Sequence, residues 1–291
     1  MDRVLRNTAG AIRQEFRDST GALVDADGNA TGVTAEIFDS SGTRTPDSAL
    51  ASTKISTGLY EVALTPAMTS ILDTYSVTWS FTKTSVVNKF YSQFQTVGGF
   101  LFSVGELRAF DAALDATTYP IDVVEKARAA AEERLEQLCS VAFVPRGRRY
   151  ITDGDGDTVL RVPDVELRSV VSASISDGTT TTALTADELA DLKIDPAGIV
   201  TRWSLGSWDS GVRNVTVLYE YGYSQPPEPV KRAAMALARN NLVGLSLFDR
   251  ARSEAVEGGI LSFTLAGRDG PTGIPEVDAV IAQFGRSVYA F

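Results

Sequence analysis

The chain has 291 residues, with 27 basic and 37 acidic side chains, so its formal net charge at neutral pH is −10. It contains no histidine, which excludes serine–histidine–aspartate catalysis, histidine-ligated zinc and histidine-based pH switches. The single cysteine has no partner for an internal disulfide, and the acidic balance argues against a protein that grips nucleic acid. No apolar run is long enough to span a bilayer, and the first residues lack a secretory signal, so we expect no membrane association.

Residues 1–99 are predicted to form short strands separated by turns. In the segment 59–64, Tyr60, Val62 and Leu64 alternate with Leu59 and Glu61, so one face is apolar, and the segment 75–81 repeats this period of two. Short strands at regular spacing, with few helix signals, predict an antiparallel β-sandwich of the Ig-like kind. We expect Trp79, on a central strand, to lie in its core rather than on a ligand-binding surface.

Residues 100–291 follow a different pattern and predict a second, mainly helical domain, so the fold class is α+β. Ser103 and Glu106 form a capping box ahead of apolar residues at helical spacing, and Pro120 opens an amphipathic segment. Cys139 falls one residue beyond the apolar stripe of that segment and is expected to be a buried, inert thiol. We predict strands between residues 150 and 222, and helices over about 103–115, 120–139, 227–245 and 275–287.

An aspartate–glycine run begins like a calcium-binding loop. Asp153, Asp155 and Asp157 alternate with glycine, and Asp164 stands at the twelfth position. The sixth position, however, is Thr158, where such a loop needs glycine, and the following residues continue as a strand. The run therefore predicts a turn at a hairpin tip, and the three aspartates remain weak candidates for metal ligands.

Two further segments are candidates for contacts with other molecules. The basic cluster Arg146, Arg148 and Arg149 is interpreted as a solvated or interface loop that can touch a phosphate or a neighbouring acidic subunit. The apolar stripe of the last helix continues to the final residue, although chain ends are usually polar. It predicts an anchor that docks either on a partner or on the chain itself, through Phe284, Val288, Tyr289 and Phe291.

The sequence gives little support to an enzyme. It has no phosphate-binding G-x-x-x-x-G-K-[ST] loop and no G-x-G-x-x-G after a predicted strand. Carboxylates are plentiful, but no pair is singled out for glycoside hydrolysis, which depends on their separation in space. We expect no catalytic residues, no cofactor and no enzymatic activity.

Four segments of the second domain resemble head–tail connector (adaptor) proteins of long-tailed bacteriophages. Three occur early: ELRAF at 106–110, a helix opened by Tyr119-Pro120 and VAFVPR at 141–146. The most specific is a strand ending in Tyr-Gly-Tyr at 221–223, followed by prolines and a helix from about 227. These segments appear in the family's order and together span about half of the chain.

The resemblance implies a structural virion protein at the neck, made in the host bacterial cytoplasm. Such proteins assemble as a ring, typically of twelve copies, between the portal protein and a stopper or tail-completion protein. DNA passes through without sequence-specific binding, which fits the 27 acidic and 19 basic side chains of residues 100–291, a net charge of −8. The N-terminal sandwich is an addition to the minimal family pattern, and a peripheral contact is its expected role. A surface or receptor-binding module that uses this sandwich is the alternative function.

Overall fold

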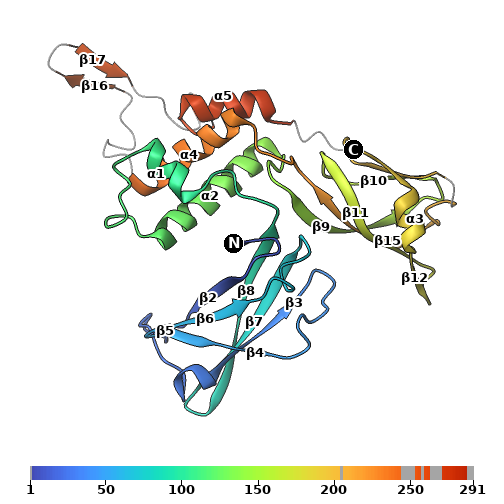
Figure 1. Ribbon diagram of the computed structural model, residues 1–291, viewed down its shortest axis with the longest axis horizontal. Helices are drawn as coiled ribbons and strands as arrows, with labels where there is room; N and C mark the ends of the chain where they lie inside the picture. Colours follow the sequence, from blue (N-terminus) through green and yellow to red (C-terminus); the bar gives the residue numbers. More distant parts are fainter. Residues whose placement is uncertain (1, 204–205, 244–252, 257–258, 263–270, 287–291) are drawn as a thin grey trace. The chain divides into compact units, whose positions relative to one another are not determined.

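The computed structural model describes residues 2–203, 206–243, 253–256, 259–262 and 271–286 (Figure 1). The fold is α+β, as predicted, and the chain divides into two compact units. The first unit combines residues 1–99 with 145–222, and the second combines residues 100–144 with 223–291. This grouping differs from the sequence-based division, which placed residues 145–222 with the helices.

Residues 2–99 of the first unit form two β-sheets with one apolar core between them. The larger sheet has the strand order β1 (Asp2–Leu5), β8 (Val86–Val97), β7 (Thr74–Lys83), β3 (Val33–Phe38) and β4 (Leu50–Ala51). The smaller has the order β2 (Gly10–Glu15), β6 (Leu59–Leu64) and β5 (Thr53–Ser56), and the short 3-10 helix η1 spans Asn29–Gly32. The prediction of a purely antiparallel arrangement is wrong for one pair, because β1 runs parallel to β8. No hairpin joins these two strands, so nothing forces opposite directions on them.

Aromatic rings fill the space between the two sheets. Trp79 is fully buried, as predicted, and its indole N–H donates to the Ser92 hydroxyl at 2.9 Å. Phe16 stacks on Phe81 with ring centroids 4.4 Å apart and meets Tyr60 edge-on at 5.6 Å. Each of these rings comes from a strand or strand end whose alternate residues face outward, which is the pattern that the sequence shows.

Residues 145–222 form a four-stranded antiparallel sheet and a smaller three-stranded one. The larger has the order β12 (Thr181–Ala183), β11 (Leu167–Ser176), β15 (Gly211–Tyr221) and β9 (Arg146–Gly154). The smaller has the order β10 (Val159–Arg161), β14 (Ile199–Arg202) and β13 (Leu192–Asp195). The predicted strands are present, but β9 begins at Arg146 rather than near residue 150. A short helix, α3 (Ala186–Asp191), was not predicted, although Thr185 and Glu188 form a capping box at its start.

Close backbone contacts join this four-stranded sheet to residues 2–99. A Cβ placed on Gly147 would lie 1.6 Å from the carbonyl oxygen of Leu72, so glycine alone fits there. The amide of Gly98 donates to the carbonyl of Pro145 at 2.9 Å, and Arg6 pairs with Glu220 at 2.7 Å. These contacts explain why residues 145–222 group with the N-terminal sheets.

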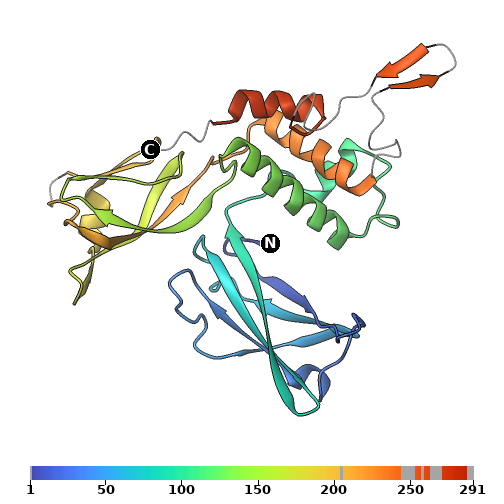
Figure 2. The same cartoon turned by 180° about the vertical axis from the view of Figure 1, so that it is seen from behind.

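The second unit is built on four helices, α1 (Val104–Phe110), α2 (Ile121–Cys139), α4 (Glu228–Val243) and α5 (Pro275–Phe284). The predicted capping box is present, with Ser103 and Glu106 bonded to each other's backbone N–H. Helix α1 ends earlier than predicted, because the Asp111 carboxylate accepts the amide of Ala113 and turns the chain. Helices α2 and α4 lie side by side in both views (Figures 1 and 2).

Helices α2 and α4 both bury small residues, Ala127 and Ala131 on α2 and Ala234 and Ala238 on α4. Ion pairs connect α4 to its other neighbours, with Lys231 on Glu106 at 3.3 Å and Arg239 on Asp111. A hairpin of β16 (Ser253–Val256) and β17 (Gly259–Ser262) precedes α5 and was not predicted. Within the described residues, no helix has the length and apolarity needed to cross a bilayer.

We predict that Gly147→Ala lowers the free energy of unfolding by about 3 kcal/mol, because the new methyl group cannot avoid the Leu72 backbone. Urea denaturation followed by circular dichroism measures the change. Gly105→Ala is the matched control, since its Cβ meets nothing closer than 3.8 Å and alanine favours the helix. Equal stability of the two variants would contradict the close approach.

Candidate assembly surfaces

The basic cluster lies on a strand and not in the loop that the sequence suggested. Arg146, Arg148 and Arg149 belong to β9, which pairs antiparallel with β15. Arg146 is only 2% exposed and donates to the Gln95 side-chain oxygen at 3.2 Å. Pairing along β15 is what extends this segment, a long-range effect that local composition does not reveal.

The other two arginines differ in what they contact. Both carboxylate oxygens of Asp164 accept from Arg148 at 3.1 Å, and the Tyr219 hydroxyl donates to the same carboxylate at 2.5 Å. Burial and the Asp164 charge raise the pKa of Tyr219, which keeps this hydroxyl protonated as a donor. The Arg149 side chain has no ion-pair or hydrogen-bond partner among the described residues. Of the three arginines, Arg149 is therefore the one available to another molecule.

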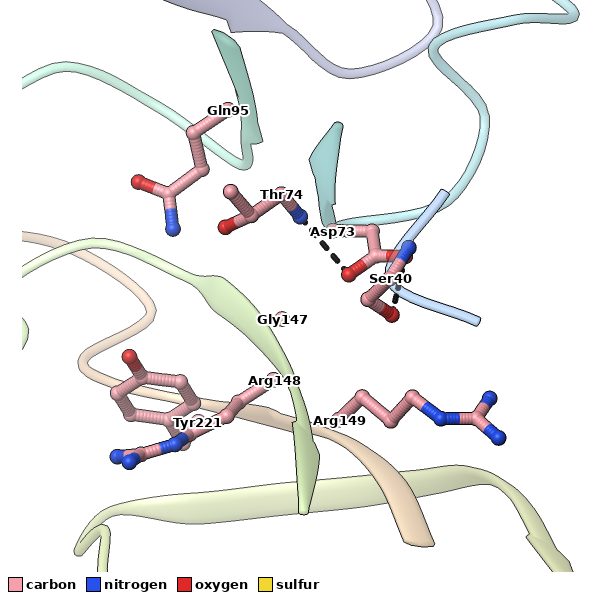
Figure 3. Close-up of a pocket in the computed structure, with 8 residues that line it drawn as sticks. All are labelled: Ser40, Asp73, Thr74, Gln95, Gly147, Arg148, Arg149 and Tyr221. Atoms are coloured by element: carbon pink, nitrogen blue, oxygen red, sulfur yellow. Dashed lines mark hydrogen bonds between the residues drawn. The ribbon is translucent and has the colours of Figure 1, made fainter. Parts of the chain in front are cut away.

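A cavity of about 260 Å³, lined mostly by polar side chains, lies beside the start of β9 (Figure 3). In its lining, the buried Asp73 carboxylate accepts from the amide and hydroxyl of Ser40, at 3.0 and 2.7 Å, and from the amide of Thr74 at 2.8 Å. Three hydrogen bonds satisfy this charge within the chain, so the carboxylate needs no cation. The cavity is lined by Ser40, Asp73, Thr74, Gln95, Gly147, Arg148, Arg149 and Tyr221.

The aspartate–glycine run forms a turn, as predicted, but not at a hairpin tip. It connects β9 and β10, which belong to different sheets, and Gly156 has a positive φ of 85°. The Asp155 carboxylate accepts the amide of Asp157 at 2.9 Å, and Asp153 accepts the amide of Arg213 at 2.6 Å. Two of the three candidate ligands thus serve local backbone groups. Across the described ranges, no set of three acidic or cysteine side chains is arranged to hold a metal ion.

The C-terminal helix packs on its own unit as far as the structure describes it. Phe284 meets Phe143 edge-on, with ring centroids 5.8 Å apart, and the amide of Arg286 donates to the carbonyl of Cys139 at 3.0 Å. The apolar end was expected to dock either on a partner or on the chain itself. Phe284 packs on the chain itself. Val288, Tyr289 and Phe291 lie outside the described residues, so their docking role stays a prediction.

Two of the segments that carry the family resemblance meet in space. The amide of Tyr223 donates to the carbonyl of Ala142 at 3.1 Å, and the Tyr223 ring stacks on Phe143 at 5.8 Å. Gly222, with a φ of 96°, takes the left-handed conformation in the turn directly before Tyr223. The run at 141–146 and the Tyr-Gly-Tyr junction at 221–223 thus form one aromatic contact across 80 residues of sequence.

Several exposed apolar side chains were missed by the sequence interpretation. Tyr91 is 76% exposed on the outward face of β8, and Phe110 and Ile121 are exposed near the ends of α1 and α2. Consecutive side chains of a strand point to opposite faces, and Phe90 faces inward, so Tyr91 faces outward. This alternation along β8 would have predicted the exposure of Tyr91.

No family model matches the chain, and no curated protein matches it. Among solved structures, a chain from the neck of an empty gene transfer agent (GTA) particle, computed with C6 symmetry, is 16% identical. The match covers 65% of this chain and 92% of that one, with a TM-score of 0.43. A chain from the neck of the native particle, computed with C12 symmetry, is 15% identical over 64% of this chain and 90% of that one, with a TM-score of 0.42.

We predict that Cys139 resists thiol reagents in the folded protein. Burial, with a smaller effect of the Glu136 charge, raises the pKa of this thiol to about 11. At pH 8 only about one thiol in a thousand would then be ionised, against roughly a quarter in the unfolded chain. Titration with a chromogenic disulfide should show one reactive thiol in denaturant and none in buffer within the same time. Rapid modification in buffer would contradict the burial.

Proposed function

We propose that this chain is a structural connector that forms a ring between the portal vertex and the tail of a phage-like particle. The observation that carries the proposal is the contact of Tyr223 with Ala142 and Phe143. Two of the segments that resemble the connector family come from distant parts of the sequence, and here they share one packed site. If these segments resembled the family only by chance, we would not expect them to pack against each other.

The helical unit has the features that such a part requires. Its helices are joined by small-residue packing and ion pairs, so it can present a rigid surface to neighbouring copies. The acidic excess of residues 100–291 disfavours adhesion of DNA during its passage. In this proposal, the chain acts without cofactor or catalysis, and its partners are further copies of itself, the portal protein and a stopper or tail-completion protein.

We infer that the N-terminal pair of sheets is an Ig-like sandwich that makes peripheral contacts on the particle. Its exposed Tyr91 favours a second candidate function, a surface or receptor-binding module. An aromatic ring facing solvent on a sheet offers an apolar surface with a polar end to a partner. In that case the helical unit would serve as the mount for the sandwich.

The test is mass photometry of the purified chain, alone and mixed with portal complexes from the same source. We expect uniform particles of several subunits that bind portal. A monomer that does not bind portal complexes would overturn the connector role. Glycan binding by that monomer, lost in the variant Tyr91→Ala, would establish the second function.

The same assay tests the apolar C-terminus. Removing residues 287–291 should abolish portal binding, because Val288, Tyr289 and Phe291 are lost together. It should shift the melting temperature by less than about 2 °C, since the contact of Phe284 with Phe143 is retained. Unimpaired portal binding by this variant would exclude the C-terminus as the docking segment.

A further inference from the structure

The segment that leads from β14 into β15 carries two strongly exposed apolar side chains. Trp203, directly after β14, is 75% exposed, and Val212, the second residue of β15, is 83% exposed. The other two tryptophans of the chain, Trp79 and Trp208, are fully buried. Burial is the usual state of this side chain, and tryptophan is among the residues most enriched at the energetic centres of protein interfaces. The exposure of Trp203 therefore marks a candidate docking contact.

Backbone hydrogen bonds hold this segment against the aspartate–glycine turn between β9 and β10. Directly before Trp203, the amide of Arg202 donates to the carbonyl of Thr158 at 2.9 Å. Further along the segment, the amide of Trp208 donates to the carbonyl of Asp157 at 2.7 Å. Trp203 therefore projects from backbone that is attached to the turn on both sides.

A β-bulge places Val212 beside the same turn. Residues 212–214 of β15 lie opposite a single residue of β9. The buried Asn214 side chain holds the bulge, because it accepts from the amide of Gly154 and donates to the carbonyl of Asp209, both at 2.7 Å. Bulges re-aim side chains at the end of a sheet, which accounts for the outward position of Val212. Docking of side chains on backbone that is already ordered costs little conformational entropy.

The backbone next to this apolar pair carries an acidic excess. The segments 153–158 and 203–213 contain four aspartates against one arginine, a net charge of −3. All four aspartates are exposed, and none of them forms an ion pair within the described residues. We call Trp203, Val212, Asp155, Asp157 and Asp209 the apolar–acidic tip.

The charge of the tip discriminates between partners. Carboxylates beside an apolar anchor are repelled by the phosphates of DNA and by anionic lipid headgroups. A second copy of this chain is itself acidic, with a net charge of −10, and is repelled at long range as well. The complementary surface is an apolar pocket with lysine or arginine at its rim, since interfaces combine an apolar centre with a polar edge of matching charge.

We propose that the apolar–acidic tip docks on a different protein of the particle, with Trp203 and Val212 in an apolar pocket and the three aspartates facing basic side chains at its rim. This inference rests on the proposed function for the presence of the chain in a particle. It goes beyond that function by assigning a partner contact to the β-sheets of the first unit, separate from the C-terminal segment.

Site-specific photo-cross-linking in assembled particles tests the contact. The photoreactive residue benzoylphenylalanine, which is also aromatic and apolar, replaces Trp203 in the full chain, and the particles are purified and irradiated. Mass spectrometry then identifies the cross-linked peptides. The same replacement at Thr179, an exposed residue of the turn between β11 and β12, is the matched control.

We expect position 203, and not position 179, to cross-link to another protein of the particle, beside lysine or arginine residues of that protein. A cross-link to a second copy of this chain would overturn the proposed partner. No cross-link from particles that contain the chain and portal would overturn the docking tip and leave the connector role intact. Absence of the chain from purified particles would overturn both.

The chemistry of the pocket is tested by calorimetry with the purified cross-linked partner. Trp203→Ala should weaken binding at least about tenfold, as expected for a central anchor. Val87→Ala, which also shortens an exposed apolar side chain, is the matched control and should change nothing.

The aspartates are tested together in the triple variant Asp155→Asn, Asp157→Asn and Asp209→Asn. Asparagine can still accept the amide hydrogen bond that Asp155 receives from residue 157, so the turn is retained. Binding should weaken roughly three- to tenfold at about 50 mM salt and match the parent at about 500 mM, where the charges are screened. Unchanged or tighter binding by this variant at low salt would exclude a basic rim.

Discussion

The structure of the first unit depends on one close approach, in which the backbone of β9 passes against the carbonyl of Leu72 at Gly147. Any side chain at this position would separate the four-stranded sheet from the N-terminal sheets. The hydrogen bond from Gly98 to Pro145 and the ion pair between Arg6 and Glu220 act at the same junction. These contacts join residues 2–99 to residues 145–222 in one unit. The residues between them, 100–144, belong to the helical second unit.

That junction also determines how the three arginines of β9 are used. Arg146 is buried at the start of the strand, beside Gln95, and Arg148 neutralises Asp164 together with the Tyr219 hydroxyl. Only Arg149, on the opposite face of the strand from these two, is without a partner in the described residues. The same strand is paired on one side alone from residue 148 onward. The unpaired charge and the unpaired backbone edge therefore occur on the same strand.

The second unit is organised around Phe143, whose ring touches Tyr223 and Phe284. The three aromatic residues come from the segment after α2, the junction before α4 and the end of α5, so one site connects most of the helical unit. Ion pairs from Lys231 and Arg239 hold α4 to residues at the two ends of α1. A unit held together at several separate points is suited to present a rigid surface to neighbouring copies, which is the role proposed for it.

Local sequence patterns were sufficient to predict the features that depend on near neighbours in the chain. The capping box at Ser103, the stripes of α2 and α4, the burial of Trp79 and the turn at Gly156 each depend on residues within a few positions of one another. Only the tertiary structure decided which strands pair: that β1 runs parallel to β8, that β9 and β10 enter different sheets, and that residues 145–222 join the N-terminal sheets. The physical reason is that alternation along a strand specifies which side chains face a core. It does not specify the neighbouring strand, which is selected by contacts between residues far apart in the chain.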